Sequence, residues 1–228
     1  KPADRPLQNT AIPAPSVQLH TGCTLPLVGR EVLDDTRHIL HILGYTVHEP
    51  AQQTCCGALA QHNGLHTIAQ QQISQNRTAF DASLPLLSCA SGCSIQLRES
   101  APDISVNDIV AFLNDHLSRQ AVTLRALPLR VAVFTPCTAR HGLREGEALS
   151  QLLQRIPQLT CLPLPATCCG AAGSHVITQR AQAHSLRTPL TQRIAQLHTQ
   201  APLDAVITSN IGCAMHLGGV LPSGVKMW

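Results

Sequence analysis

The chain alternates between short apolar runs and longer segments in which apolar residues recur every three or four positions. Short runs rich in apolar and β-branched side chains predict strands, and the longer spacing predicts helices that are apolar on one face. Gly44 stands where a glycine would end the first helix, and a short helix is expected around Cys93. The strands expected in the first half cover residues 16–20, 45–47 and 84–87, and the longer helices cover 32–43, 65–80 and 108–117.

The second half repeats this order. Its expected strands cover residues 129–134, 159–164 and 205–208, and its helices cover 145–156 and 178–198. Strands that alternate with helices are typical of parallel sheets joined by right-handed crossovers. The sequence therefore predicts an α/β fold with two pseudo-symmetric Rossmann-like lobes, each built on a parallel sheet.

The expected domain boundaries follow from this repeat. Residues 1–16 are rich in proline and are expected to form a linker. The first lobe is expected over 17–122 and the second over 123–228. Residues 106–108 lead into a helix in the first half, whereas the matching residues 225–227 lie at the end of the chain. The second lobe is therefore expected to be truncated at its C-terminus.

A cysteine motif recurs at corresponding places in the two halves. The segments Thr54–Ala58 and Thr167–Ala171 both read Thr-Cys-Cys-Gly-Ala. One further cysteine precedes each copy at the end of an apolar run, and another follows each copy within a Gly-Cys dipeptide. Such internal repetition indicates two copies of one structural unit. The eight repeated cysteines, our candidate metal ligands, are Cys23, Cys55, Cys56 and Cys93 in the first half and Cys137, Cys168, Cys169 and Cys213 in the second.

All eight cysteines follow predicted strands. In parallel α/β sheets ligands bind beyond the carboxyl ends of the strands, so the four thiols of each half are expected to converge at one rim. Thiolates are the ligands of iron-sulfur clusters and of zinc, and both remain open at this point. The Cys-x2-Cys knuckles of ordinary zinc ribbons are absent.

Adjacent cysteines need an irregular backbone to reach one metal site, because neighbouring side chains in a strand point to opposite faces. Gly57 and Gly170 directly follow the two pairs and allow such a turn. A helix is expected to start after each turn. Its amino end would stabilise the thiolates through free N–H groups and the helix dipole.

Composition excludes several classes of protein. A net charge of +3, with 13% charged and 2% aromatic residues, does not fit a nucleic-acid-binding protein. There is no apolar run of membrane-spanning length and no signal-peptide pattern. Vicinal cysteines in a long periodic chain disfavour a disulfide framework. We expect a folded metal or redox protein whose surface is partly covered by partners.

The motif set resembles the cysteine-rich CCG domain family. This family includes a cysteine-rich component of heterodisulfide reductase and the iron-sulfur subunits of glycolate oxidase, of lactate-utilising systems and of anaerobic glycerol-3-phosphate dehydrogenase. The resemblance runs from about residue 17 to residue 228 and is strongest to the carboxyl-terminal part of the glycolate oxidase (glycolate dehydrogenase) iron-sulfur subunit. The segments that carry it are Cys55–Leu59, Ala90–Cys93, Pro136–Thr138, Cys168–Gly173 and Ser209–Cys213.

The resemblance implies an iron-sulfur electron-transfer subunit that is not an active enzyme alone. It implies one or two 4Fe-4S clusters held by the eight cysteines, with zinc as the alternative in one site. The implied partners are flavoprotein subunits that oxidise glycolate to glyoxylate. A ferredoxin-like domain is implied upstream, because this chain lacks a Cys-x2-Cys-x2-Cys run. Electrons would pass to a quinone or another acceptor, in the cytoplasm or at the inner face of the cytoplasmic membrane through peripheral association of the complex.

Rival functions remain open at this point. The family also implies relatives that act on lactate, glycerol 3-phosphate or a disulfide, and a zinc-bound or metal-free scaffold for flavoprotein subunits is a further alternative. Heterodisulfide reductase relatives have a fifth cysteine in each copy, at positions matched here by Ala90 and Asn210. Its absence favours four-thiolate clusters. Cys89 and Cys161 are expected to be buried structural thiols.

Two histidines recur with the motif. His62 and His175 lie at the same distance after the second cysteine of each pair. They are candidate cofactor-binding residues that donate to a cluster sulfur or carry a proton beside it, and the alternative is a helix-capping or core role. His20, His141 and His216 are expected to have local structural roles. No Ser-His-Asp set or phosphate loop stands out, so no catalytic residue is assigned.

Overall fold

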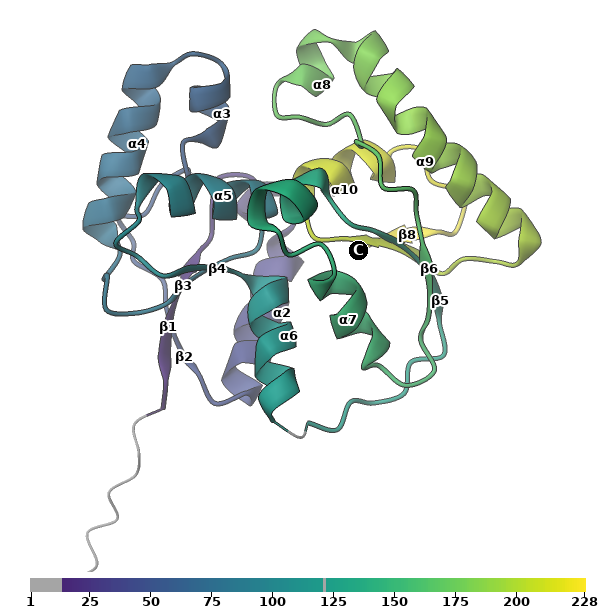
Figure 1. Cartoon of the computed structure of the whole chain (residues 1–228), viewed down its shortest axis with the longest axis horizontal. Coiled ribbons are helices and arrows are strands. Elements are labelled where there is room, and N and C mark those ends of the chain that lie inside the picture. The colour runs from purple at the N-terminus through teal and green to yellow at the C-terminus, as the bar shows by residue number, and fades with distance from the viewer. Residues whose placement is uncertain (1–13, 121) are drawn as a thin grey trace, which may run out of the picture.

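Two four-stranded parallel sheets form the core of the protein (Figure 1). The computed structural model describes residues 14–120 and 122–228, so most of the expected linker lies outside the described residues. The strand order is β2-β1-β3-β4 in the first sheet and β6-β5-β7-β8 in the second. The strands are β1 Ser16–His20, β2 Thr46–His48, β3 Leu86–Ser88, β4 Val106–Asp108, β5 Arg130–Phe134, β6 Thr160–Pro163, β7 Ala205–Thr208 and β8 Lys226–Met227. The predicted α/β fold, with the same parallel arrangement in each half, is confirmed.

Helices connect consecutive strands and cover both faces of each sheet (Figure 1). Among the described residues, no helix has the length and apolar character needed to cross a membrane. The helices are α1 Leu25–Val28, α2 Arg30–Ile42, α3 Ala58–His62, α4 His66–Ala79, α5 Ser91–Ser100, α6 Ile109–Arg119, η1 Thr138–Leu143, α7 Ala148–Gln154, α8 His175–Thr178, α9 Arg180–Gln200 and α10 Ile211–Gly218, where η1 is a π-helix.

The central strands are buried on both faces, which explains their apolar runs. In β1, Val17 and Leu19 pack with residues of α2 and α6 in one core cluster. On the other face of the same sheet, Leu86 packs against Leu97 of α5. A parallel sheet covered by helices on both faces needs this kind of sequence, since neither face of its central strands meets water.

The structure differs from the predicted elements mainly at the sheet edges and after β5. The edge strands β4 and β8 were not predicted, because segments of three and two residues carry no visible periodicity. The helix expected over 145–156 starts only at Ala148. Residues 144–147 form the turn between η1 and α7, and Arg144, which directly follows η1, has a left-handed φ of 60°. Gly44 ends α2 as predicted, with a φ of 85°.

The two halves pack directly against each other. Helix α5 contacts η1, and α6 contacts α7. Arg98 of α5 donates to the Glu145 carboxylate over 2.7 Å, which joins the halves by an ion pair that is about one quarter exposed. Ile95 lies so close to Gly142 that a Cβ at Gly142 would overlap it. The carboxyl ends of both sheets are thereby held in a defined relative position.

A buried carboxylate lies beside this junction. Asp108 caps α6 by accepting from the Val110 N–H over 3.1 Å and also accepts from the Ser94 hydroxyl over 3.1 Å. Burial raises the pKa of Asp108 to about 6, well above 3.8, against the lowering effect of the Val110 hydrogen bond. The folded chain therefore retains a proton that the unfolded chain loses between about pH 4 and pH 6. The free energy of unfolding consequently falls as the pH rises through this window.

We expect Asp108→Asn to remove this penalty while it preserves the helix cap. Above pH 6 the variant should be more stable than the parent by up to about 3 kcal/mol, the equivalent of about two pKa units, and the difference should vanish below pH 4. Denaturant unfolding at pH 4 and pH 8 measures this, with the exposed Asp35→Asn as the control. A loss of stability in Asp108→Asn at both pH values would contradict it.

Candidate metal centre

The structure brings the repeated cysteines together in two groups, one beyond the carboxyl ends of each sheet. In the first sheet Cys23 follows β1, the vicinal pair follows β2, and Cys93 lies in the first turn of α5 after β3. The second sheet has the same arrangement, with Cys137 after β5 and Cys213 in the first turn of α10. Adjacent parallel strands end at one edge, and this geometry gathers three distant segments.

The four thiols of the first half, Group 1, form a continuous set. A hydrogen bond with Cys55, together with burial, raises the pKa of Cys23. The pKa of Cys56 is raised to about 12, because the contact with Cys93 and burial outweigh the lowering effect of Cys55. Cys23 is exposed, whereas Cys56 is buried. Group 1 therefore reaches the surface on its Cys23 side.

The four thiols of the second half, Group 2, are equally close. The Sγ atoms of Cys169 and Cys213 are 2.8 Å apart, and both thiols are buried. The hydrogen bond with Cys213 lowers the pKa of Cys169 to about 7, while the same contact raises the pKa of Cys213. Burial and the neighbouring charges of Cys168 and Cys169 raise the pKa of Cys137. Each thiol of Group 2 thus lies within electrostatic reach of the others.

Both vicinal pairs sit in a turn that only glycine adopts readily. Gly57 has a φ of 91° and Gly170 a φ of 83°, in the left-handed region that costs other residues energy. Gly57 directly precedes α3. In the second turn the Gly170 N–H donates to the Cys168 Sγ over 3.3 Å. The turn therefore places both thiols on one side and supplies an N–H group that stabilises a thiolate.

Buried polar side chains hold the first turn. Asn76 of α4 is 2% exposed; its Oδ1 accepts from the Thr54 N–H over 2.8 Å and its Nδ2 donates to the Cys55 carbonyl over 2.9 Å. The His20 Nε2 lies 3.0 Å from the Thr54 carbonyl. Gln53 accepts from the Thr21 N–H over 2.9 Å. This network ties the turn to the end of β1, where Cys23 follows.

A cation holds the second turn instead. The Arg140 guanidinium of η1 donates to the carbonyls of Ala166 and Thr167, over 2.8 and 3.2 Å. These two residues directly precede Cys168. The two turns therefore share a backbone geometry but are held by hydrogen bonds from different side chains. An amide side chain bonds to the backbone of the first turn, and a guanidinium bonds to the backbone of the second.

Comparison with known proteins agrees with this arrangement. The cysteine-rich domain model of the CCG family matches residues 17–98 and 131–218, which include all eight cysteines of the two groups. The chain belongs to the CCG family. The two matched segments contain one cysteine group each and lie in different halves, although the edge strands β4 and β8 fall outside them, so each half carries one CCG unit.

Two curated relatives illustrate the range of the CCG family. The glycolate oxidase iron-sulfur subunit of Escherichia coli is 28% identical over 230 residues, and the match covers 91% of this chain and 54% of that protein. Lactate utilization protein A of Anoxybacillus flavithermus is 26% identical over 222 residues, with 90% and 91% covered. The chain thus spans about half the length of the glycolate oxidase subunit and most of the length of lactate utilization protein A.

Among solved structures, the match to a putative Asp/Glu racemase from Yersinia pestis covers 93% of each chain at 10% identity. Its TM-score of 0.35 is too low to support any argument.

The two repeated histidines occupy different surroundings in the two CCG units. His62 ends α3, and its side chain is exposed. His175 begins α8 and is half-buried, and its Nε2 is a buried atom without a hydrogen-bond partner among the described residues. A buried nitrogen without a partner in the chain is free to bond to a water molecule or a bound group. His175 therefore remains a candidate donor toward a bound group, and His62 is a weaker one.

The other histidines and thiols take structural positions. Burial lowers the pKa of His20 and of His216, whose Nε2 lies 3.3 Å from the Ala183 carbonyl. His141 is exposed in η1. Cys89 is buried 3.4 Å from the Thr36 hydroxyl, and burial raises its pKa to about 11. Cys161 is half-buried in β6.

The two thiol groups meet the chemical requirements of a metal cluster. Four soft donors per group are the ligand complement of a 4Fe-4S cluster and also of tetrahedral zinc. Among residues 14–120 and 122–228, no three His, Cys, Asp or Glu side chains are arranged to hold a single ion. The donor chemistry and the orphan His175 nitrogen therefore fit a cluster.

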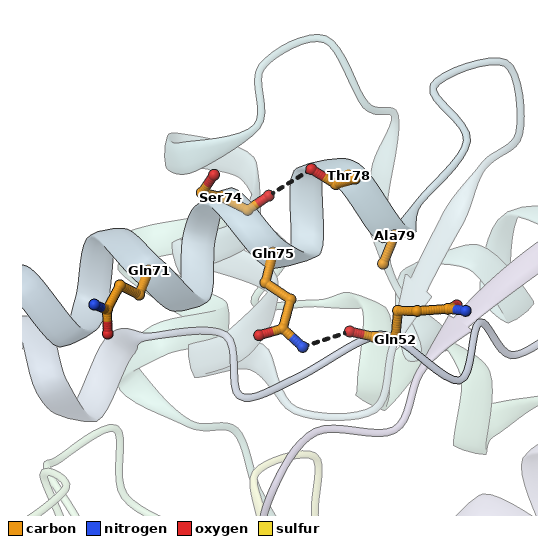
Figure 2. A pocket seen from close by; sticks show the side chains of 6 residues that line it. All are labelled: Gln52, Gln71, Ser74, Gln75, Thr78 and Ala79. Carbon is orange, nitrogen blue, oxygen red and sulfur yellow. Dashed lines mark hydrogen bonds between the residues drawn. The ribbon is translucent and has the colours of Figure 1, made fainter.

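A hollow on the outer side of α4 offers no comparable chemistry. Figure 2 shows it between α4 and the segment before the first CCG turn, with the Gln75 side chain donating to the Gln52 carbonyl over 2.7 Å. Its volume is about 620 Å³. None of its lining side chains is titratable, so its two hydroxyl groups have no base among the lining residues, which are Gln52, Gln71, Ser74, Gln75, Thr78 and Ala79. It is therefore not a candidate active site.

Sequence reasoning missed the residues that hold the CCG turns. Asn76 lies in an amphipathic helix and reads as a surface residue, and Arg140 lies in a segment whose π-helix was not predicted. Their partners are remote in sequence.

Proposed function

We propose that Groups 1 and 2 each hold a 4Fe-4S cluster and that the chain transfers electrons within an oxidoreductase complex. The observation that carries this proposal is the convergence of two complete sets of four thiols at the carboxyl ends of two sheets. The ligands would be the eight cysteines of the two groups. Zinc in one group is the alternative occupant, since zinc also takes four thiolates.

A 4Fe-4S cluster bound at either group would supply one-electron redox chemistry. The residues of the chain would keep the thiolates in place and limit access of water. In Group 2, the Gly170 N–H that donates to the Cys168 Sγ would stabilise a thiolate at that position. His175 would donate from its unpartnered nitrogen. Such donors stabilise negative charge on sulfur and raise the reduction potential.

The finer function that we propose is that of the glycolate oxidase-type iron-sulfur subunit. Its support is the 28% identity over 91% of this chain. In this proposal, flavoprotein subunits oxidise glycolate to glyoxylate, a ferredoxin-like domain precedes this segment, and electrons leave toward a quinone or another acceptor. The chain would work in the cytoplasm, with contact to the membrane only through the complex.

Lactate oxidation is the second candidate. Its support is the 26% identity to lactate utilization protein A over 90% of this chain. In either case we propose that the flavoprotein partner sets the substrate. Affinity capture from source cells, followed by assay of the captured flavoprotein with glycolate and with lactate, separates the two.

Electron transfer itself is tested on the anaerobically purified chain. We expect iron and acid-labile sulfide, and an EPR signal that appears on reduction with dithionite and disappears on addition of a water-soluble quinone. About two zinc ions per chain without iron would contradict the proposal and favour a structural scaffold.

A further inference from the structure

The amide of Asn210 lies where three cysteine-bearing segments meet. Its Oδ1 accepts from the N–H groups of Gly212 and Cys213, over 2.9 and 3.4 Å, and so caps α10. Its Nδ2 donates to the Ser91 hydroxyl over 3.1 Å and to the Thr138 hydroxyl over 3.4 Å. One side chain thus bonds to both halves of the protein.

The two hydroxyls are themselves adjacent to metal-ligand candidates. Ser91 and Thr138 are bonded to each other over 2.6 Å, and Ser91 is fully buried. Ser91 lies in the same helical turn as Cys93 of Group 1, and Thr138 directly follows Cys137 of Group 2. A displacement of the Asn210 amide would therefore reach cysteines of both groups.

The surrounding packing leaves little freedom for these segments to adjust. Gly142 of η1 has no room for a Cβ against Ile95 of α5, so the two helices are in close contact. The start of α10 lies against the second CCG turn, where a Cβ at Gly212 would be 3.8 Å from that of Ala171. In densely packed elements of this kind, a displacement of one segment shifts its neighbours, because there is no free space to take it up.

The pseudo-equivalent position in the first half does not provide this link. Ala90 precedes α5 as Asn210 precedes α10, but its methyl group makes no capping hydrogen bond. Among the described residues, the amide link between the two groups therefore comes from the second half alone.

We propose that Asn210 is a positioning residue shared by the two cysteine groups, which fixes Cys93 of Group 1 together with Cys137 and Cys213 of Group 2. The competing explanation is a purely local cap of α10. A local cap would affect Cys213 alone, whereas a shared residue affects a cysteine in the other half of the chain.

Thiol alkylation of the metal-free full chain distinguishes the two roles without any cluster. Iodoacetamide labelling is followed by mass spectrometry at Cys93, Cys137 and Cys213. Asn210→Ala should accelerate labelling at all three by about fivefold, which corresponds to the loss of one ordinary hydrogen bond from the closed state. The serine of Asn210→Ser can still cap α10 but is too short to reach the Ser91 and Thr138 hydroxyls. This variant should therefore accelerate the labelling of Cys93, while the labelling of Cys213 stays near the parental rate.

Two controls exclude general loosening of the fold. Asn114→Ala removes another amide between the halves, on exposed surface of α6 bonded to Gln151 over 2.8 Å, and should change no labelling rate at the three cysteines. Cys161 is half-buried in the edge strand β6, which carries none of the segments bonded to Asn210, so its labelling rate should stay constant. Acceleration confined to Cys213 in Asn210→Ala would overturn the proposal.

A second readout rests on the proposed function. In a Cys169→Ser background only Group 1 should carry a cluster, and adding Asn210→Ala should shift its reduction potential and EPR g values although Asn210 belongs to the other half. Unchanged values would overturn the shared role. Absence of iron in the Cys169→Ser parent would instead contradict the cluster assignment, and the alkylation result would still decide the role of Asn210.

Discussion

Replacing Gly170 by alanine should destabilise the protein by about 4 kcal/mol and abolish metal binding at Group 2. Two effects add: the φ of 83° strains any side chain other than glycine, and a Cβ here would overlap the Ala183 carbonyl oxygen of α9. The overlapping atom belongs to helix backbone and cannot rotate away. Either the second CCG turn or α9 must move, and both lie next to Cys169.

Gly57→Ala provides the matched control for this prediction. Its φ of 91° is equally unfavourable, but its Cβ would lie 3.4 Å from the Ala69 carbonyl, which is ordinary contact. We expect a loss of about 2 kcal/mol from strain alone. Thermal unfolding and metal content of both variants test the difference. Equal losses in the two variants would mean that the close approach of α9 to the turn has no energetic consequence.

Asn76→Ala should selectively weaken metal binding at Group 1. The substitution leaves the Thr54 N–H and the Cys55 carbonyl without their side-chain partners, at a cost of about 2 kcal/mol. Asn76→Asp keeps the acceptor but loses the donor, so it should have an intermediate effect. Group 2 is held by Arg140 and should keep its metal.

The neighbouring Gln75 provides the control. Gln75→Ala removes an exposed side chain that donates to Gln52 at the rim of the hollow in Figure 2, and it should leave both groups unchanged. Metal analysis and free energies of unfolding of the three variants provide the measurement. Equal metal loss from both groups in Asn76→Ala would show that this residue supports the general fold and not the first turn.

Features that repeat or follow a local period could be predicted from the sequence. Such patterns predicted the order of strands and helices, the turn glycines and the grouping of the eight cysteines. For the grouping, the one additional rule was that ligands of a parallel sheet bind beyond the carboxyl ends of its strands. Edge strands as short as β8 could not be predicted, since their pairing depends on a long-range neighbour. The later start of α7 could not be predicted either, because nothing in the sequence marks the turn that separates η1 from α7.

The supporting residues around the site were beyond sequence reasoning for a different reason. The roles of Asn76, Arg140 and Asn210 exist only through partners in other elements, and each residue alone is typical of a surface. In the sequence, Asn210 is notable only because heterodisulfide reductase relatives have their fifth cysteine at the matching position. The structure gives it a positive role, as the cap of α10 and a link to Ser91 and Thr138.

The most direct test of the central claim is the iron and sulfide content of four anaerobically prepared chains: the parent, Cys56→Ser, Cys169→Ser and Cys161→Ser. We predict about eight iron atoms in the parent and in Cys161→Ser, and about half that number, with a remaining EPR signal, in each of the other two. Zinc without iron in the parent, or iron content unaffected by both Cys56→Ser and Cys169→Ser, would contradict the account.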